Sequence, residues 1–231
     1  MPVITLSRQF GAGGASIGRS LAARFGAELL DREVVARVAA RSGIPEAEAE
    51  GYDERLPSLW QRLTAALAAS APEAIMAPVP PDAMGGLALG ERLFAVTRAV
   101  IEEAAATGNA VILGRGAGFL LADRPAVLRV QLHASLSARV RYLQARVEEL
   151  PRGALDLDDA ALRDLCRRVD AARATYIRSH FDADWNDVRR YDLALDTGRL
   201  GLGRSIDLIE AAARQLAAKP DEPDAPPGDA P

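Results

Sequence analysis

The residues best suited to bind phosphate lie in segment 7–16. This segment follows a short apolar run, residues 3–6, and contains Gly11, Gly13 and Gly14. Glycine permits backbone conformations that aim several N–H groups at one anion, and the N-terminus of a following helix adds its dipole. The segment therefore predicts a phosphate-binding turn, with a tight strand-to-helix turn as the alternative. The residues predicted to contact phosphate are Gly11, Ala12, Gly13, Gly14, Ala15 and Ser16.

The turn departs from the strict phosphate-loop pattern, which is Gly, any four residues, Gly-Lys and then Ser or Thr. If Gly13 is the final glycine, Arg8 stands where the first glycine belongs and Gly14 replaces the lysine. We hypothesise that Arg8 restores the missing positive charge. The Ser16 hydroxyl is the candidate protein ligand for Mg²⁺.

A second group of chemically capable residues lies on a long helix expected from about residue 158 to 180. Arg163, Arg167 and Asp170 share one side at helical spacing. The opposite face is predicted to be apolar, formed by Leu162, Leu165, Val169, Ala172 and Tyr176. The alternative to a functional arginine cluster is a solvated, charged helix face.

Strands alternate with helices along the chain, and this alternation determines where the glycine-rich segment and the arginine-bearing helix lie in the fold. Apolar runs predict buried strands, and spacings of three and four residues predict helices. The fold class is therefore α/β, a parallel sheet with helices on both faces in three layers. In such folds ligands bind beyond the carboxyl ends of the strands. The predicted strands are 3–6, 28–30, 110–113, 127–132 and 193–196, and the predicted helices are about 14–25, 31–40, 89–106, 135–147, 158–180 and 205–217.

Two stretches differ in composition from this pattern. Residues 51–90 combine an amphipathic piece around Trp60 with a Pro/Ala/Gly-rich linker that runs through Gly85 and Gly86. This predicts an inserted lobe with a flexible loop. The tail 220–231 is rich in proline and aspartate and is expected to be disordered.

Composition and charge exclude several function classes. The 231 residues carry a net charge of −4, so bulk electrostatics do not favour nucleic-acid binding. Cys166 is the single cysteine, and the two histidines, His133 and His180, lie far apart, which excludes a disulfide framework and the common zinc motifs. No apolar run reaches membrane-spanning length, so we expect a cytoplasmic protein with no membrane partner. The abundant arginine is suited to phosphate, or reflects genome composition.

Five ordered blocks of the sequence resemble the cytidylate kinase-like family of P-loop nucleoside monophosphate kinases. Together they span about residues 3–210, and the segment 45–90 matches weakly. The blocks are 4–14, 30–33, 111–117, 185–187 and 191–193. The resemblance implies a P-loop NTPase-type domain over residues 1–219, an acceptor-binding lobe at about 45–90 and a lid at about 152–190.

The resemblance also implies roles for particular residues. Asp31, Arg32 and Arg115 would bind the acceptor monophosphate, although N-capping by Asp31 and strand-end capping by Arg115 are alternatives. Ordinary cytidylate kinases carry aspartate after the arginine of the third block, where this chain has Gly116. This change weakens cytosine selectivity. The predicted catalytic residues are Arg8, Arg167, Arg168, Asp170 and Arg173.

The function implied is ATP- and Mg²⁺-dependent phosphoryl transfer to a nucleoside monophosphate, with CMP or dCMP favoured. Two alternatives stay open: a kinase of the same fold with another small-molecule acceptor, and a catalytically weak nucleotide-binding regulatory protein that lost turnover with its loop lysine. The sequence does not determine the oligomeric state.

Overall fold

The computed structural model describes residues 3–31, 81–150, 154 and 157–218. Within these ranges five strands form one sheet in the order β2-β3-β1-β4-β5, and every neighbouring pair is parallel. This confirms the predicted fold class. The strands are β1 (Val3–Arg8), β2 (Glu28–Leu30), β3 (Ala110–Leu113), β4 (Val127–His133) and β5 (Leu193–Asp196).

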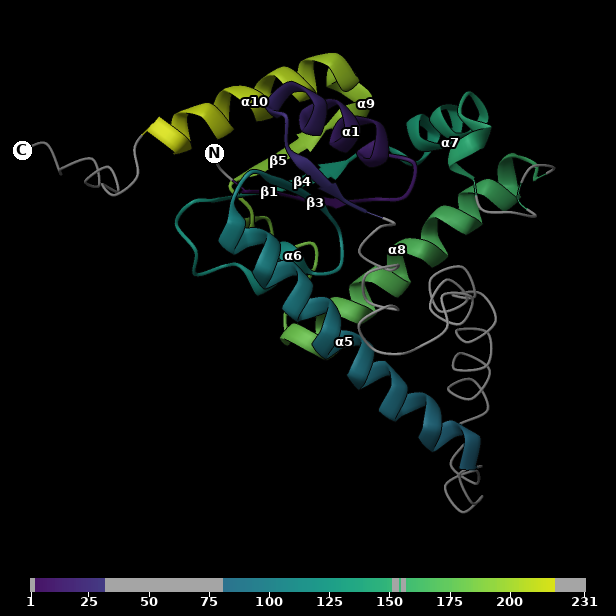
Figure 1. Ribbon diagram of the computed structural model, residues 1–231. Helices are drawn as coiled ribbons and strands as arrows, with labels where there is room; N and C mark the ends of the chain where they lie inside the picture. The colour runs from purple at the N-terminus through teal and green to yellow at the C-terminus, as the bar shows by residue number, and fades with distance from the viewer. Residues whose placement is uncertain (1–2, 32–80, 151–153, 155–156, 219–231) are drawn as a thin grey trace, which may run out of the picture.

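Helices cover both faces of the sheet, as Figure 1 shows. Helices α1 and α10 pack on one face and bury Ile17, Leu21 and Ile209 against the strands. Helices α5 and α6 cover the other face, where Ile101 and Leu121 are fully buried. The helices are α1 (Gly14–Phe25), α5 (Pro81–Thr107), α6 (Ala117–Leu120), α7 (Leu136–Gln144), α8 (Asp159–Phe181), α9 (Thr197–Leu200) and α10 (Leu202–Ala218), with 3₁₀ turns η2 (Val147–Glu149) and η3 (Val188–Arg190).

The elements differ from the sequence predictions at several places, which include an unpredicted helix α9 and a start of α10 at Leu202 instead of Ser205. Helix α5 begins at Pro81, so the prediction that residues 81–88 form a loop is wrong. Proline is favoured in the first turn of a helix, where its missing N–H costs no hydrogen bond. Helix α7 ends at Gln144, before Val147, which belongs to η2. The short helix α6 follows β3 and was not predicted.

Several predicted segments lie outside the described residues. These are the predicted helix 31–40 from residue 32 on, the part of the inserted lobe up to residue 80, and the tail 220–231. The predicted lid region, about 152–190, contains α8 and η3 in the described part of the chain. No helix in the described ranges is long and apolar enough to cross a membrane.

Candidate functional site

The turn between β1 and α1, called the phosphate turn from here on, leaves the first N–H groups of α1 without a side-chain cap. The N-cap residue of α1 is Gly13, which has no side chain to accept a hydrogen bond from these groups. Gly11 and Gly13 have φ angles of +78° and +75°, in the left-handed region that glycine adopts without strain. The first N–H groups of a helix have no intrahelical acceptor. They are therefore suited to bind an external anion, and phosphate binding by this turn stays a prediction.

Side chains from distant elements hold this turn in place. Thr197 donates its hydroxyl to the carbonyl of Ala12 at 3.0 Å. The Gln9 side chain accepts the N–H of Ala134 at 3.1 Å, and the N–H of Gln9 donates to the carbonyl of Leu132 at 2.9 Å. The turn is thus fixed to β4 and α9.

A buried ion pair between α7 and α8 also contacts the turn. Arg139 Nη1 lies 2.5 Å from Asp170 Oδ2, and the side chains are 8% and 14% exposed. The N–H of Phe10 donates to Asp170 Oδ1 at 2.8 Å, and the carbonyl of Phe10 accepts from Arg139 Nη1 at 3.1 Å. Both polar backbone groups of Phe10 are therefore held by one ion pair.

Arg8, at the end of β1, lies across two glycines. A Cβ atom on Gly14 would be 2.7 Å from Arg8 Cγ, and one on Gly114 would overlap the Arg8 guanidinium. The aliphatic part of Arg8 thus occupies the space beside Gly14, the residue at the lysine position of the strict pattern. The backbone carbonyl of Arg8 accepts a hydrogen bond of 2.6 Å from Arg173.

Helix α8 turns a different face inward from the one predicted. Its buried residues are Leu162, Cys166 and Ile177, and Asp170 and Arg173 lie on this same face toward the phosphate turn. The prediction that Asp170 lies opposite Leu162 is wrong. A charged residue can face inward here because the ion pair with Arg139 compensates for its desolvation.

The structure does not bring the whole predicted arginine cluster to the turn. Arg167 and Arg168 are exposed. Arg168 pairs with Asp164 one turn earlier on the same helix, at 3.1 Å. Asp170 and Arg173 are the predicted lid residues that contact the turn in this structure.

Ser16, the predicted magnesium ligand, lies among polar groups of the segment after α7. Its hydroxyl donates to Glu149 Oε1 at 2.9 Å and lies 3.1 Å from the Tyr142 hydroxyl. Arg19 and Arg146 donate to the same Ser16 oxygen at 3.4 and 3.3 Å. Burial is the largest effect on Tyr142 and raises its pKa to about 12.

Two guanidinium groups and the Glu149 carboxylate surround the Ser16 hydroxyl, so the charges beside it favour neither a phosphate oxygen nor a divalent cation alone. Ala15, which has no ligand atom in its side chain, occupies the Ser/Thr position of the strict pattern. Among the described residues no group of three or more His, Cys, Asp and Glu could hold a metal ion. The role of Ser16 as a magnesium ligand stays a prediction.

The predicted acceptor residues follow β3 and β2, the two strands that lie on one side of β1. Asp31 comes directly after β2, and Arg115 follows β3, with which β2 is paired. Arg32 lies outside the described residues. Gly114, Arg115 and Gly116 have φ angles of +79°, +58° and +70°, so three consecutive residues are left-handed. Such a conformation costs a non-glycine residue about 1–2 kcal/mol, and Arg115 is held in it by the surrounding structure.

The structure explains why residue 116 is glycine. A Cβ on Gly116 would overlap the ring of Phe181, and it would lie 3.4 Å from Ile177. An aspartate at this position would therefore need Phe181 to move. The space beside Gly116 that an aspartate side chain would need is filled here by the Phe181 ring.

The two late sequence blocks anchor the chain to β1 and β4. Trp185 donates its indole N–H to Ser7 Oγ at 3.3 Å, and the Tyr191 hydroxyl donates to the carbonyl of Trp185 at 2.8 Å. Asp192 holds Arg129 in a bidentate ion pair, with distances of 3.2 and 2.7 Å. These motif residues support the sheet instead of facing the phosphate turn.

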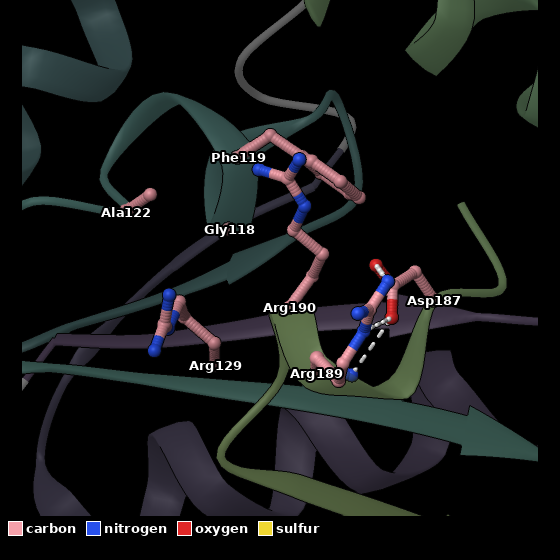
Figure 2. A pocket seen from close by; sticks show the side chains of 7 residues that line it. All are labelled: Gly118, Phe119, Ala122, Arg129, Asp187, Arg189 and Arg190. Atoms are coloured by element: carbon pink, nitrogen blue, oxygen red, sulfur yellow. Dashed lines mark hydrogen bonds and ion pairs between the residues drawn. The ribbon is translucent and has the colours of Figure 1, made fainter. Parts of the chain in front are cut away.

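A separate open pocket lies beside α6 and η3 (Figure 2). Figure 2 shows the Arg190 side chain extending toward Phe119, while Arg189 pairs with Asp187 at 2.8 Å. The residues that line this pocket are Gly118, Phe119, Ala122, Arg129, Asp187, Arg189 and Arg190. It contains none of the predicted site residues, so it is distinct from the phosphate turn.

Sequence reasoning missed Arg139, Tyr142 and Glu149. A signal for Arg139 was present, since it directly precedes Val140 and lies four residues before Leu143, on the face of α7 that the structure buries. An arginine on the buried face of an amphipathic helix needs a partner. No comparable pattern marks Glu149.

Comparisons with known proteins identify the family of the chain. The family model described as the cytidylate kinase-like family matches residues 3–199. A cytidylate kinase of Methanothrix thermoacetophila is 31% identical over 112 residues, which are 48% of this chain and 59% of that protein. The match therefore spans less than two thirds of that relative.

Two solved structures share the fold. An uncharacterized protein from Eubacterium ventriosum superposes with a TM-score of 0.63 at 17% identity, covering 93% of this chain and 99% of that one. A shikimate kinase from Bacteroides thetaiotaomicron gives a TM-score of 0.52 at 16% identity, with coverages of 92% and 98%. At these identities the likeness shows a shared α/β fold and identifies neither the activity nor the acceptor.

Proposed function

Since the chain belongs to the cytidylate kinase-like family, we propose that it transfers a phosphoryl group from ATP to a nucleoside monophosphate, with CMP or dCMP as the acceptor. An acceptor phosphate oxygen attacks the γ-phosphorus of ATP, and the bond from that phosphorus to the bridging oxygen of ADP breaks. The products are ADP and a nucleoside diphosphate. The reaction needs positioning and charge stabilisation more than covalent participation by the protein.

The observation that carries this proposal is the position of Arg8. Its side chain runs along Gly14, where the strict pattern has lysine, and its guanidinium reaches Gly114 at the end of β3. The ends of β1 and β3 are adjacent, since Leu6 pairs with Leu113. A guanidinium there lies between the turn that would hold ATP and Arg115, which would hold the acceptor. Charge on the transferring phosphoryl group would develop between these two sites.

The other predicted residues take supporting roles in this proposal. Within the predicted segment Gly11–Ser16, the first helical N–H groups, those of residues 14–16, would bind the ATP phosphates, and Arg115 would make bidentate contacts to the acceptor phosphate. Asp31 and Arg32 would border the acceptor. Mg²⁺ would arrive on the phosphates of ATP, a common arrangement for this ion, and would neutralise part of their charge.

One observation favours the alternative of another acceptor. Phe181 fills the space next to Gly116 that an acceptor-recognising aspartate would use. A coupled assay of ADP release with CMP, dCMP, UMP, AMP and non-nucleotide acceptors tests both functions. We expect CMP or dCMP to accelerate ADP release most. Acceleration by a different acceptor supports the same-fold alternative, and ATP binding without acceleration by any acceptor supports the regulatory protein.

The role of Arg8 has a matched control, Arg24, on the helix that follows the turn. Arg8→Ala should lower kcat about 100- to 1,000-fold, the usual effect of removing one charge-stabilising donor. Arg24, on α1, pairs with the exposed Asp207 and with Glu210 of α10, away from the turn. Arg24→Ala should therefore leave kcat within about twofold, because exposed ion pairs contribute little. Equal, small effects of the two substitutions would contradict the role of Arg8.

A further inference from the structure

The ion pair of Arg139 and Asp170 directs its hydrogen bonds at one peptide segment of the phosphate turn. Arg139 is 6% exposed, and its Nε has no hydrogen-bond partner among the described residues. Removing two charges from water is costly, so a buried ion pair is weak evidence for stability. Its geometry suggests another role, since both its members bind the backbone of Phe10.

Phe10 directly precedes the glycines that form the turn. The next residue, Gly11, packs so closely on α7 that an added Cβ would lie 3.0 Å from the Arg139 carbonyl oxygen. The N–H of Ala12 donates back to the carbonyl of Gln9 at 3.2 Å. The orientation of the following N–H groups therefore depends on where the Phe10 peptide groups are held.

A fixed turn matters more in this chain than in one with a loop lysine. Gly14 supplies no charge, and the Arg8 guanidinium lies farther away, at Gly114, so the backbone N–H groups beside Gly14 provide a larger share of the interaction with the donor phosphates. Dipoles that are already oriented stabilise charge without a cost of reorganisation when the ligand binds. Loss of the contacts to Phe10 would impose that cost.

We propose that Arg139 is a positioning residue for the phosphoryl transfer: together with Asp170 it holds both polar backbone groups of Phe10, so that the turn is preformed for the donor phosphates. This inference rests on the proposed function. It also assigns Asp170 a role through the turn instead of contact with the transferring group. In this proposal Arg139 acts through Phe10 and not on the substrate directly, since its side chain is only 8% exposed and its Nη1 donates to Asp170 and to the Phe10 carbonyl.

The test compares Arg139→Met with Arg129→Met in the full chain. Arg129 is also ion-paired, to Asp192 at 2.7 Å, but it lies on β4 beside the separate pocket and makes no contact with the turn. The measurements are the Kd of ATP by calorimetry, well below the melting temperature of each variant, and the KM for ATP. We expect Arg139→Met to raise both about tenfold or more and Arg129→Met to change them by less than about twofold.

A double-variant cycle tests whether the pair acts as one unit. If Arg139 and Asp170 act through the same peptide groups, Arg139→Met combined with Asp170→Asn should weaken ATP binding no more than the stronger single variant does. Additive effects would indicate separate roles and contradict the proposal. Arg139→Lys should recover part of the affinity, since an ammonium can donate to Phe10 or Asp170.

The outcomes separate this inference from the proposed function. A folded Arg139→Met protein with wild-type ATP affinity overturns the positioning role. If Arg139→Met does not fold, Arg139→Lys and Asp170→Asn decide, and unchanged affinity in both overturns it. A wild-type protein that binds ATP but phosphorylates no nucleotide refutes the proposed function, while the Kd comparison still tests Arg139. A wild-type protein that binds no ATP contradicts both.

Discussion

Glycine at positions 14 and 114 is explained by one side chain, that of Arg8. Each glycine leaves room that a Cβ would take from this arginine. The sequence predicted Arg8 as a substitute for the missing lysine from spacing alone, because strand and turn are contiguous. Arg139 was not predicted, because its role depends on Asp170, 31 residues further along the chain. Local periodicity carries no information about such a partner.

Replacing Gly114 with alanine tests this explanation at the scale of one residue. Gly114 and Gly26 both have positive φ angles, +79° and +57°, but nothing lies within 4 Å of a Cβ on Gly26. Both alanine variants should lose about 1–2 kcal/mol of stability from left-handed strain. Gly114→Ala alone should displace Arg8 and lower kcat by about 100-fold. Urea unfolding and the ADP-release assay measure the two effects, and similar kcat values in both variants would show that Arg8 does not depend on Gly114.

Among the elements, the strands were the most predictable and the orientation of α8 the least. All five predicted strands are present in the described residues, because buried parallel strands are continuous apolar runs bounded by turn residues. The inward face of α8 was predicted wrongly because apolar periodicity places Asp170 outside. The start of α5 was missed because Pro81, Gly85 and Gly86 favour a loop in isolation.

The contact between α5 and α8 predicts a dependence of stability on pH. The ring of His180 on α8 stacks on Phe94 of α5, with centroids 4.1 Å apart and planes at 8°. Partial burial lowers the pKa of His180. Between the folded and the unfolded pKa of His180 the unfolded chain therefore binds more protons than the folded chain. The contribution of neutral His180 to stability is complete above the unfolded pKa of about 6.5 and is lost as the pH falls below it.

The measurement is urea unfolding of the wild type and His180→Gln at pH 7.5 and 5.5. The wild type should lose more stability between these two pH values than the variant does, since glutamine does not titrate. The effect should be small, because His180 is largely exposed. A variant that loses as much as the wild type would show that protonation of His180 is not coupled to this contact.

At the scale of the whole molecule, the strand order brings distant segments to one edge. The central strand β1 lies between β3 and β4, so the turn after it meets Arg115 on one side and α7 on the other. The alternation of strands and helices predicted this arrangement, since parallel strands end at the same edge. The side-chain contacts that fix the turn span 125 to 185 residues of sequence and could not be predicted from it.

A turn held by so many contacts should bind a triphosphate without the rest of the nucleotide. We expect both ATP and inorganic tripolyphosphate to raise the melting temperature of the full chain. A ligand at 100 times its Kd stabilises by about 2.7 kcal/mol, which corresponds to roughly 5–10 °C for a domain of this size. Tripolyphosphate should need a higher concentration, because it lacks the nucleoside contacts.

Arg8→Ala should reduce the melting-temperature shift caused by both ligands, and Arg24→Ala should not. A shift with ATP and none with tripolyphosphate, at any concentration, would mean that the nucleoside carries the binding and that the turn is not a preformed phosphate site.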